Sequence, residues 1–141
     1  MYQLRGKLSI VMPAYNEEAL IYNSIMQTLS IVEQFAPDME IIAVNDGSKD
    51  KTKQEIERAI RDDAKQPHPV VPGMRVSGTR IKLVTSNKNR GKGNAIISGI
   101  SQAEGDYIAF VDADLELNPA QLEGYLKKMQ ESGSDVVIGC K

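Results

Sequence analysis

Short apolar runs alternate along this chain with longer segments in which apolar residues recur three or four positions apart. The short runs are typical of strands buried on both faces of a sheet, and they occupy residues 8–12, 39–44, 81–85, 107–111 and 136–139. The spaced pattern predicts helices over residues 17–35, 50–65, 94–103 and 118–132. Strands separated by helices pair in parallel through right-handed crossovers. We therefore predict an α/β fold with one open, mainly parallel, Rossmann-like sheet and helices on both faces.

Polar residues mark the start of three of these helices. Asn16 is predicted to cap the first and Asp50 the second, and Asn118, followed by a proline, opens the last. Residues 66–80 hold three prolines and two glycines, which predicts a long, mobile loop that is dispensable for folding. The alternation of strands and helices resumes after this loop. Residues 1–141 are therefore expected to form one domain, a size that suits a single core.

Composition excludes several classes of function. The formal net charge is -2 and the 17 Lys and Arg are scattered, which argues against nucleic acid as a partner. Cys140 is the single cysteine, so an internal disulfide and a cysteine-based zinc cluster are excluded, and a buried apolar role is favoured. His68 stands alone in the proline-rich loop, which favours a structural role. No apolar run is long enough for a transmembrane helix, and the N-terminus is too short and mixed for a signal peptide.

The residues that follow the strands carry the candidate chemistry, because open α/β sheets bind ligands over the carboxyl ends of their strands. Asp112 and Asp114 come directly after the run 107–111. If the strand continues, alternation places both carboxylates on one face. Two close carboxylates repel each other, and a divalent cation keeps both ionised. Oxygen ligands suit Mg²⁺ or Mn²⁺. The alternative is a strand-end turn without a metal, where Asp is common.

A glycine-flanked loop offers a second candidate site. Arg90 and Lys92 stand in this loop, where a helix begins, and helix N-termini favour anions. The loop lacks the GxxxxGK[ST] spacing of a Walker motif, because Ser86 and Gly93 occupy two of its defining positions.

Four motifs, in order, resemble the family 2 glycosyltransferases with the GT-A fold: SIVMPAYNEE at 9–18, NDGSKD at 45–50, NRGKG at 89–93 and DAD at 112–114. Within that family the pattern is similar to dolichol-phosphate mannose synthases and polyprenyl-phosphate sugar transferases. The resemblance implies metal-dependent, inverting transfer from a nucleoside diphosphate sugar of the UDP-glucose or GDP-mannose type. The implied acceptor is a polyprenyl or dolichyl phosphate.

The resemblance also implies roles for individual residues. The nucleotide and its diphosphate are expected to contact Pro13, Ala14, Tyr15, Glu17, Asp46, Arg90, Lys92, Asp112 and Ala113. Tyr15 would stack on the base, while Glu17 and Asp46 would accept hydrogen bonds from base or ribose. Asp112 and Asp114 are expected to be catalytic and to hold Mg²⁺ or Mn²⁺, with Glu116 as a third metal ligand.

Each of these roles has a simpler alternative in the sequence. Glu17 also suits a helix N-terminus by its charge, and Asp46 suits a turn in which it bonds Gly47 or Ser48. Lys92 also fits a solvated surface position, and Glu116 fits a charge at the entry of a helix. The sequence leaves these alternatives open.

The chain departs from the family pattern in two places. Gly-Cys-Lys stands at 139–141 where relatives of this branch carry Gly-Ser-Arg, and the loop 66–80 is longer than usual. The acceptor-binding half, a base and a membrane anchor are expected downstream, so the chain resembles the N-terminal, donor-binding part of a longer protein. That protein would be cytoplasmic, at the cytoplasmic face of a membrane. The alternatives are a non-catalytic nucleotide-binding domain and a nucleotidyltransferase, which would need a basic, glycine-rich loop at 13–18.

Overall fold

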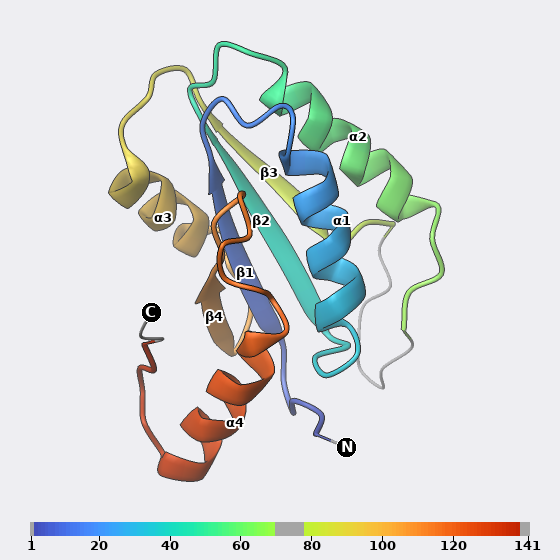
Figure 1. Cartoon of the computed structure of the whole chain (residues 1–141), viewed down its shortest axis with the longest axis vertical. Coiled ribbons are helices and arrows are strands. Elements are labelled where there is room, and N and C mark those ends of the chain that lie inside the picture. The colour runs from blue at the N-terminus through green and yellow to red at the C-terminus, as the bar shows by residue number, and fades with distance from the viewer. Residues whose placement is uncertain (1, 70–77, 139–141) are drawn as a thin grey trace.

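The computed structural model describes residues 2–69 and 78–138. Within them, strands and helices alternate along the whole chain (Figure 1). The elements are β1 (Leu8–Ala14), α1 (Ile21–Val32), β2 (Met39–Asp46), α2 (Thr52–Ala64), β3 (Ile81–Ser86), α3 (Lys92–Ser101), β4 (Tyr107–Phe110) and α4 (Gln121–Ser132).

The four strands form one parallel sheet in the order β3-β2-β1-β4. In this register Ile10 of β1 lies opposite Ile41 of β2 and Ala109 of β4. The chain builds outward from β1 to β3 and then returns to place β4 on the other side of β1. The order of strands therefore reverses at β1, and ligands of open α/β sheets bind at the carboxyl ends of the strands beside such a switch point.

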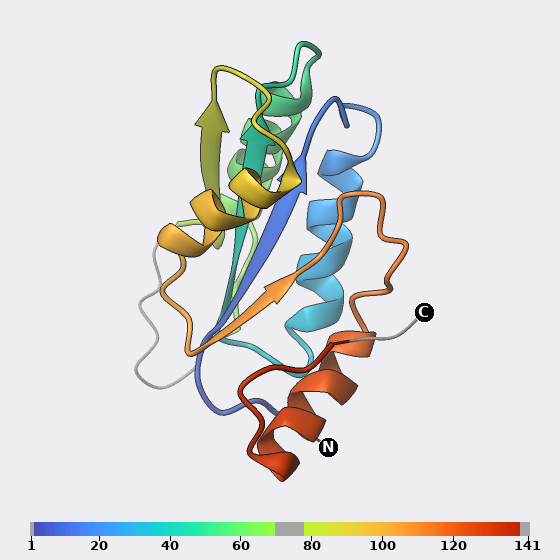
Figure 2. The ribbon, with the colours of Figure 1, turned by 90° about the vertical axis from the view of Figure 1, so that its left-hand side faces the viewer.

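Helices cover both faces of the sheet, as Figure 2 shows with α3 on one side and α1 and α4 on the other. The larger core lies under α1, α2 and α4 and includes Ile10, Ile25 and Leu122. The smaller core lies under α3 and is made of Val11, Ile42, Val44 and Ala95. Alternate residues of β1 thus enter opposite cores. Gly99 lets α3 approach closely, because a Cβ there would collide with the side chain of Val11.

The predicted fifth strand is wrong for the residues that the structure describes. Residues 136–138 have no strand, and Val136 and Ile138 are 72% and 82% exposed. Residue 139 lies outside the described part of the chain. Four strands therefore make up the described sheet, against the five that were predicted.

None of the three predicted caps directly precedes its helix, because Leu20, Lys51 and Ala120 hold those positions before α1, α2 and α4. Asp50 accepts a hydrogen bond from the Thr52 N–H at 2.9 Å, and Asn118 accepts one from the Ala120 N–H at 2.9 Å. Asn16 caps no helix, because α1 begins only at Ile21 and Leu20 precedes it. The φ of Asn16 is +51°, a left-handed conformation that Asn tolerates better than most residues.

The two described ends of the proline-rich loop are fixed to the end of α2. Asp63 is fully buried and accepts hydrogen bonds from both the N–H and the guanidinium of Arg80. His68 packs against the same carboxylate, with Nε2 3.3 Å from Oδ1 of Asp63, which agrees with a structural role. The middle of the loop, 70–77, lies outside the described residues, so its predicted mobility stays a prediction.

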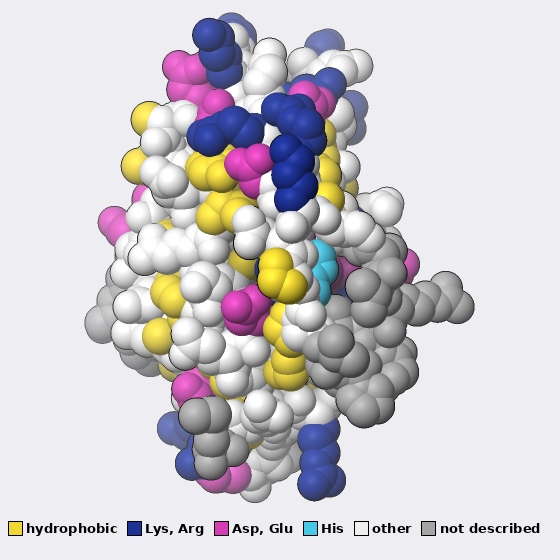
Figure 3. Space-filling view, turned by 90° about the vertical axis from the view of Figure 1, so that its right-hand side faces the viewer, with side chains coloured by type: hydrophobic (Ala, Val, Ile, Leu, Met, Phe, Trp, Pro, Cys, Tyr) yellow, Lys and Arg dark blue, Asp and Glu magenta, His cyan; other side chains and the backbone are white. Residues whose placement is uncertain are grey.

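The face of the molecule shown in Figure 3 carries charges of both signs. Most Lys and Arg side chains on this face lie toward its upper end, with Asp and Glu side chains among them, and others lie at the lower end. This interleaving fits the scattered basic residues of the sequence and its formal net charge of -2.

Candidate functional site

A cleft of about 390 Å³ opens at the carboxyl ends of β1, β2 and β4, beside the β3–α3 loop. It is lined by Pro13, Ala14, Tyr15, Glu17, Asp46, Asn89, Gly91, Lys92, Ala95, Asp112, Ala113 and Asp114. The fold thus brings together all the predicted site residues except Arg90 and Glu116. It also places them at the switch point of the sheet.

Asp112 and Asp114 reach the cleft by a different route from the one predicted. β4 ends at Phe110, and a turn follows in which the Leu115 N–H donates to the carbonyl of Asp112 at 3.0 Å. The argument from strand alternation is therefore wrong, although both carboxylates line the same cleft. Between them, Ala113 is buried, and its carbonyl accepts a hydrogen bond from the Ser24 hydroxyl of α1. This bond fixes the turn that carries both carboxylates.

Glu116, the expected third metal ligand, is not among the residues that line the cleft. Leu115 has a φ of +53°, which breaks the alternation that would have aligned Glu116 with Asp112 and Asp114. The backbone N–H of Glu116 donates to Oδ1 of Asp114 at 3.1 Å. Among the described residues, no group of three Asp, Glu, His or Cys side chains is placed to hold a metal ion. The available donor set is two carboxylates, which suits Mg²⁺ or Mn²⁺ completed by water and phosphate oxygens.

Lys92 places a cation beside this pair. It stands at the start of α3, and its Nζ lies 2.6 Å from Oδ1 of Asp112. Both side chains are about half exposed, at 61% and 49%. Lys92 is thus an ion-pairing residue of the cleft, and ligands can still reach both groups.

The wall of the cleft that the β1–α1 loop forms carries a carboxylate, Glu17. Burial raises the pKa of Glu17, and the charges of Asp114 and Asp50 raise it further. Tyr15, on the same β1–α1 loop, is 40% exposed and lines the cleft. An aromatic ring accessible at this position can stack on a planar ligand.

Hydrogen bonds between two loops hold this wall in place. The Asn16 N–H donates to the Ser48 hydroxyl at 3.0 Å, and the Lys49 N–H donates to Oδ1 of Asn16 at 2.9 Å. Glu18 makes a second pair of bonds to the β2–α2 loop. Its N–H donates to the carboxylate of Asp50 at 3.2 Å, and its own carboxylate accepts a hydrogen bond from the Lys51 N–H at 3.1 Å. These hydrogen bonds join the β1–α1 and β2–α2 loops into one structural unit.

Sequence reasoning missed these loop-bridging roles. Asn16 was interpreted as a helix cap, and Ser48 and Glu18 received no role of their own. The partners are 32 or 33 residues apart. The available signal was that two polar loops follow two neighbouring strands, so that each could supply donors and acceptors to the other.

Burial and hydrogen bonds act in opposite directions on Asp50 in this unit. Burial raises the pKa of Asp50, but hydrogen bonds from Thr52 and from the Glu18 N–H outweigh it and hold the pKa below its ordinary value. Asp50 therefore remains a carboxylate acceptor for both loops.

Asp46 sits deep in the cleft and bonds the facing loop. It is 5% exposed, and its two carboxylate oxygens accept the N–H groups of Arg90 and Gly91 at 2.9 and 3.0 Å. The alternative of a turn bond from Asp46 to Gly47 or Ser48 does not hold at Ser48, whose N–H donates to Asn45 instead. Arg90 enters the site through its backbone and is absent from the residues that line the cleft.

Comparison with known proteins identifies the family. A model described as Glycosyl transferase family 2 matches residues 9–141. The chain belongs to this family. It is 35% identical over 131 residues to an undecaprenyl-phosphate 4-deoxy-4-formamido-L-arabinose transferase of Enterobacter sp. (strain 638), covering 93% of this chain and 36% of the relative. A protein of the same name from Photorhabdus laumondii subsp. laumondii is 36% identical over 131 residues, with the same coverage.

Solved structures of glycosyltransferases share the fold. The mannosyltransferase PcManGT from Pyrobaculum calidifontis, in complex with GDP-Man and Mn²⁺, matches with a TM-score of 0.69 and 23% identity over 89% of this chain and 33% of that one. S. aureus TarS 1-349, in complex with UDP, matches with a TM-score of 0.64 and 26% identity over 92% of this chain and 33% of that one. The predicted GT-A type of α/β fold is confirmed.

This family 2 chain spans about a third of the length of the curated relatives described above. No helix among its described residues is long and apolar enough to cross a membrane.

Proposed function

We propose that this chain is the nucleotide-sugar-binding part of a metal-dependent, inverting glycosyltransferase that transfers a sugar from a UDP- or GDP-sugar to a polyprenyl phosphate. The observation that carries the proposal is the single cleft at the switch point of the sheet, which joins Asp112 and Asp114 to Tyr15 and Lys92. The names of the relatives support a polyprenyl phosphate acceptor. The complexes of two structural neighbours support a nucleoside diphosphate sugar and a divalent cation.

The cleft divides into three parts with different chemistry. Tyr15 and Glu17 stand on the wall built from the β1–α1 loop, where an accessible ring and a carboxylate suit a base and ribose. Lys92, at the start of α3, suits the diphosphate. Asp112 and Asp114 would hold Mg²⁺ or Mn²⁺, since two carboxylates with the oxygens of a diphosphate make a typical donor set.

Charge accounts for the proposed reaction. Negative charge grows on the diphosphate as its bond to the anomeric carbon breaks, and Lys92 is placed to stabilise that charge. When bound, a divalent cation would supply further positive charge at the diphosphate. A phosphate acceptor is already ionised at neutral pH, so its attack needs no strong general base. Attack from the face opposite the diphosphate would invert the configuration at that carbon.

The first part of the proposal can be tested by titrating the 141-residue chain with UDP and with GDP. We expect one of them to bind in the presence of Mn²⁺ or Mg²⁺, and we expect EDTA or Asp114→Ala to abolish most of that affinity. Calorimetry measures both. Binding that ignores the cation and the substitution would contradict the assignment of the carboxylates.

Sugar transfer itself is a proposal for the whole protein. The measurement is transfer of a radiolabelled sugar to polyprenyl phosphate at saturating donor and metal. The full-length protein is expected to transfer, whereas the 141-residue chain is expected to bind the nucleotide without turnover. A full-length protein that binds the nucleotide but transfers nothing would favour the non-catalytic alternative.

A further inference from the structure

Asp112 and Asp114 stand in the segment between β4 and α4, residues 111–120, all of which the structure describes. This described segment contains turns and no helix or strand. Its Leu115 N–H donates to the carbonyl of Asp112 at 3.0 Å. That bond shapes the turn locally, but it does not fix the turn relative to the sheet. The place of the two carboxylates therefore depends on contacts between this segment and other elements.

The segment is fastened to the rest of the fold on both sides of Asp112. On one side, Val111 is buried, and its N–H donates to the carbonyl of Val11 in β1 at 3.0 Å. On the other side, Ala113 is 3% exposed and packs in the larger core. The Ser24 hydroxyl donates to the Ala113 carbonyl, and Figure 2 shows the segment passing beside α1. This carbonyl belongs to the peptide group that leads into Asp114.

Ser24 makes this bond from the first turn of α1. The N–H groups of Leu20 and Ile21 both donate to the carbonyl of Glu17, at 3.0 and 2.9 Å, and the Ser24 N–H donates to the carbonyl of Leu20 at 2.9 Å. The backbone that carries Ser24 thus continues directly from the β1–α1 loop. Ser24 therefore joins the wall proposed for the base to the carboxylates proposed for the cation.

We propose that Ser24 is a positioning residue for the cation site. Its hydroxyl holds the Ala113 carbonyl in place, and the peptide group of that carbonyl sets the direction of Asp114 relative to Asp112. Ser24 is 6% exposed and does not line the cleft, so it acts through the turn. This inference rests on the proposed function. Loss of a residue that supports metal ligands without touching the metal typically lowers metal affinity by roughly 10–100-fold.

The test is Ser24→Ala in the 141-residue chain, with Mn²⁺ binding measured by electron paramagnetic resonance of the free ion. Binding of Mg²⁺ and of Ca²⁺ is then measured by competition with Mn²⁺. Mg²⁺ demands a nearly ideal octahedron, whereas Ca²⁺ accepts longer and more variable geometry. A displaced carboxylate pair should therefore lose roughly tenfold in Mg²⁺ affinity and only about twofold in Ca²⁺ affinity. Equal losses for the two cations, or no loss, would overturn the inference and leave the proposed function standing.

Thr28→Val is the matched control on the same helix. Thr28 lies one turn further along α1 and is fully buried, and its hydroxyl has no hydrogen-bond partner among the described residues. The substitution removes a buried hydroxyl from the same face of the helix and keeps the shape of the side chain. We expect it to leave both cation affinities unchanged. If Thr28→Val weakens the cations as much as Ser24→Ala does, α1 acts only through general packing and the inference is wrong.

Nuclear magnetic resonance of the wild-type chain tests the bond without depending on a variant. The Ser24 hydroxyl proton should exchange slowly with water, because it is buried and donates to a carbonyl. Exchange as fast as that of Ser30, an exposed serine of the same helix, would overturn the inference even if Ser24→Ala failed to fold. A wild-type chain that binds none of the three cations, with or without UDP or GDP, would overturn the proposed cation site and this inference with it.

Discussion

The two ends of the sheet use carboxylates in opposite ways. At the amino ends of the strands, Glu40 and Asp63 are buried at 4% and 0% exposure and are surrounded by cations and hydrogen-bond donors. At the carboxyl ends, Asp112 is 49% exposed and has one cation, Lys92, beside it. Buried carboxylates that are fully paired hold elements together, whereas accessible carboxylates with little compensation are available to a ligand. Burial and pairing therefore distinguish carboxylates that stabilise the fold from carboxylates of the candidate site more clearly than their charge does.

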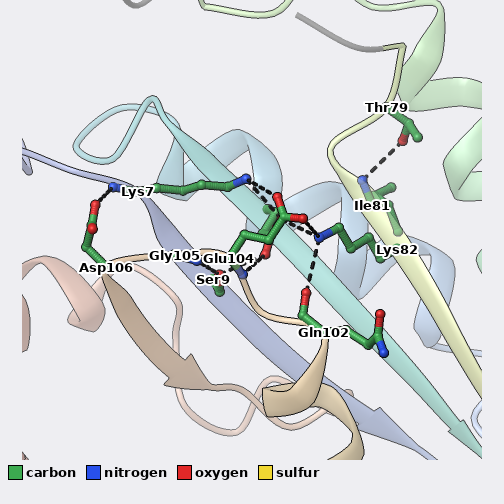
Figure 4. Close-up of polar contacts among 10 residues, drawn as sticks. Lys7, Ser9, Thr79, Ile81, Lys82, Gln102, Glu104, Gly105 and Asp106 are labelled. Atoms are coloured by element: carbon green, nitrogen blue, oxygen red, sulfur yellow. Dashed lines mark hydrogen bonds and ion pairs between the residues drawn. The ribbon is translucent and has the colours of Figure 1, made fainter. Parts of the chain in front are cut away.

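Lys7, directly before β1, and Lys82 of β3 both pair with the carboxylate of Glu40. Figure 4 shows the side chains of both lysines. Both Nζ atoms lie 3.1 Å from Oε2, and the Ser9 hydroxyl and the Glu104 N–H donate to Oε1 at 2.8 and 2.9 Å. Burial raises the pKa of Glu40, but these hydrogen bonds outweigh it and hold the pKa below its ordinary value. Glu40 thus joins three strands to the loop before β4.

The cluster around Asp63 also pairs a buried carboxylate with a cation, between the end of α2 and the start of β3. Burial raises the pKa of Asp63, but the hydrogen bonds and the charge of Arg80 outweigh it and hold the pKa below its ordinary value. Arg80 also pairs with Glu33 at 2.8 Å, so it links the start of β3 to the end of α1 as well as to α2. These bonds close the base of the proline-rich loop at the end of the sheet opposite the cleft.

The largest effect is expected from breaking the Asp63 cluster. Arg80→Met leaves the buried carboxylate of Asp63 without its main partner, which typically costs about 3–5 kcal/mol. Chemical unfolding should show this loss of stability. Nucleotide affinity of the molecules that remain folded should not change, because the cleft lies at the other end of the sheet. The control is Arg61→Met, the same substitution at an exposed position of α2. It should leave the denaturant midpoint of unfolding unchanged. A loss of stability below about 1 kcal/mol would contradict a structural role for Arg80.

A smaller effect is expected at Glu40. Glu40→Gln keeps the shape but removes the charge that Lys7 and Lys82 share, and charge-assisted hydrogen bonds are worth about 1.5–3 kcal/mol. The pKa of Glu40 is lowered by folding, so its contribution is present above its unfolded pKa and is lost as pH falls through the folded pKa. The free energy of unfolding, measured from pH 7 down to pH 3, should fall less steeply for the variant than for the wild-type chain. An unchanged slope would mean that Glu40 does not stabilise the fold through its charge.

The sequence predicts features that depend on neighbouring residues better than features that depend on contacts between distant parts of the chain. β2 was predictable because it is buried along its whole length and most of its residues are apolar, even though Glu40 interrupts the apolar run at its second position. The fifth strand was not, because Val136 and Ile138 are apolar yet have no neighbouring strand among the described residues. An apolar run predicts a strand only when a partner exists to pair with it.

The candidate site was predictable as a collection of residues but not as a geometry. Parallel topology brings strand ends together, so the gathering of Tyr15, Asp46 and Asp112 in one cleft followed from their positions in the sequence. The left-handed conformation of Leu115, which interrupts the alternation expected to align Glu116 with the aspartates, left no signal that strand periodicity could detect. The bonds from Asp46 to the 90–91 backbone also depend on a contact between distant loops.

At the accessible end of the sheet, stability and binding should separate. Asp114→Asn should change the free energy of unfolding by less than about 1 kcal/mol, because an exposed carboxylate contributes little. It should nevertheless remove most of the cation affinity. Because the charge of Asp114 helps to raise the pKa of Glu17, the variant should bring that pKa down toward its ordinary value. NMR titration of the metal-free chain measures this shift. A marked loss of stability would mean that Asp114 stabilises the fold, as Glu40 and Asp63 do. It would weaken the contrast between the two ends of the sheet.

The smallest effect on stability is expected at Lys92, where two ligands should respond in opposite directions. The ion pair with Asp112 is exposed on both sides, so Lys92→Met should change stability by no more than about 0.5 kcal/mol. Without nucleotide, Lys92 competes with a cation for Asp112, and its removal should tighten Mn²⁺ binding a few-fold. With UDP or GDP present, the same lysine faces the diphosphate, and its removal should weaken the nucleotide. Electron paramagnetic resonance of free Mn²⁺ and calorimetry of the nucleotide measure the two changes separately.

Lys88→Met is the matched control for this last prediction. Lys88 stands on the same loop but is not among the residues that line the cleft, so neither affinity should change. Opposite shifts at Lys92, with none at Lys88, mean that the lysine exchanges one anionic partner for another as the nucleotide arrives. Parallel weakening of both ligands by Lys92→Met would instead mean that the residue only supports the loop. In that case Lys92 would have a structural role beside Asp112. The carboxylates at the two ends of the sheet would then differ less in function than their exposed fractions indicate.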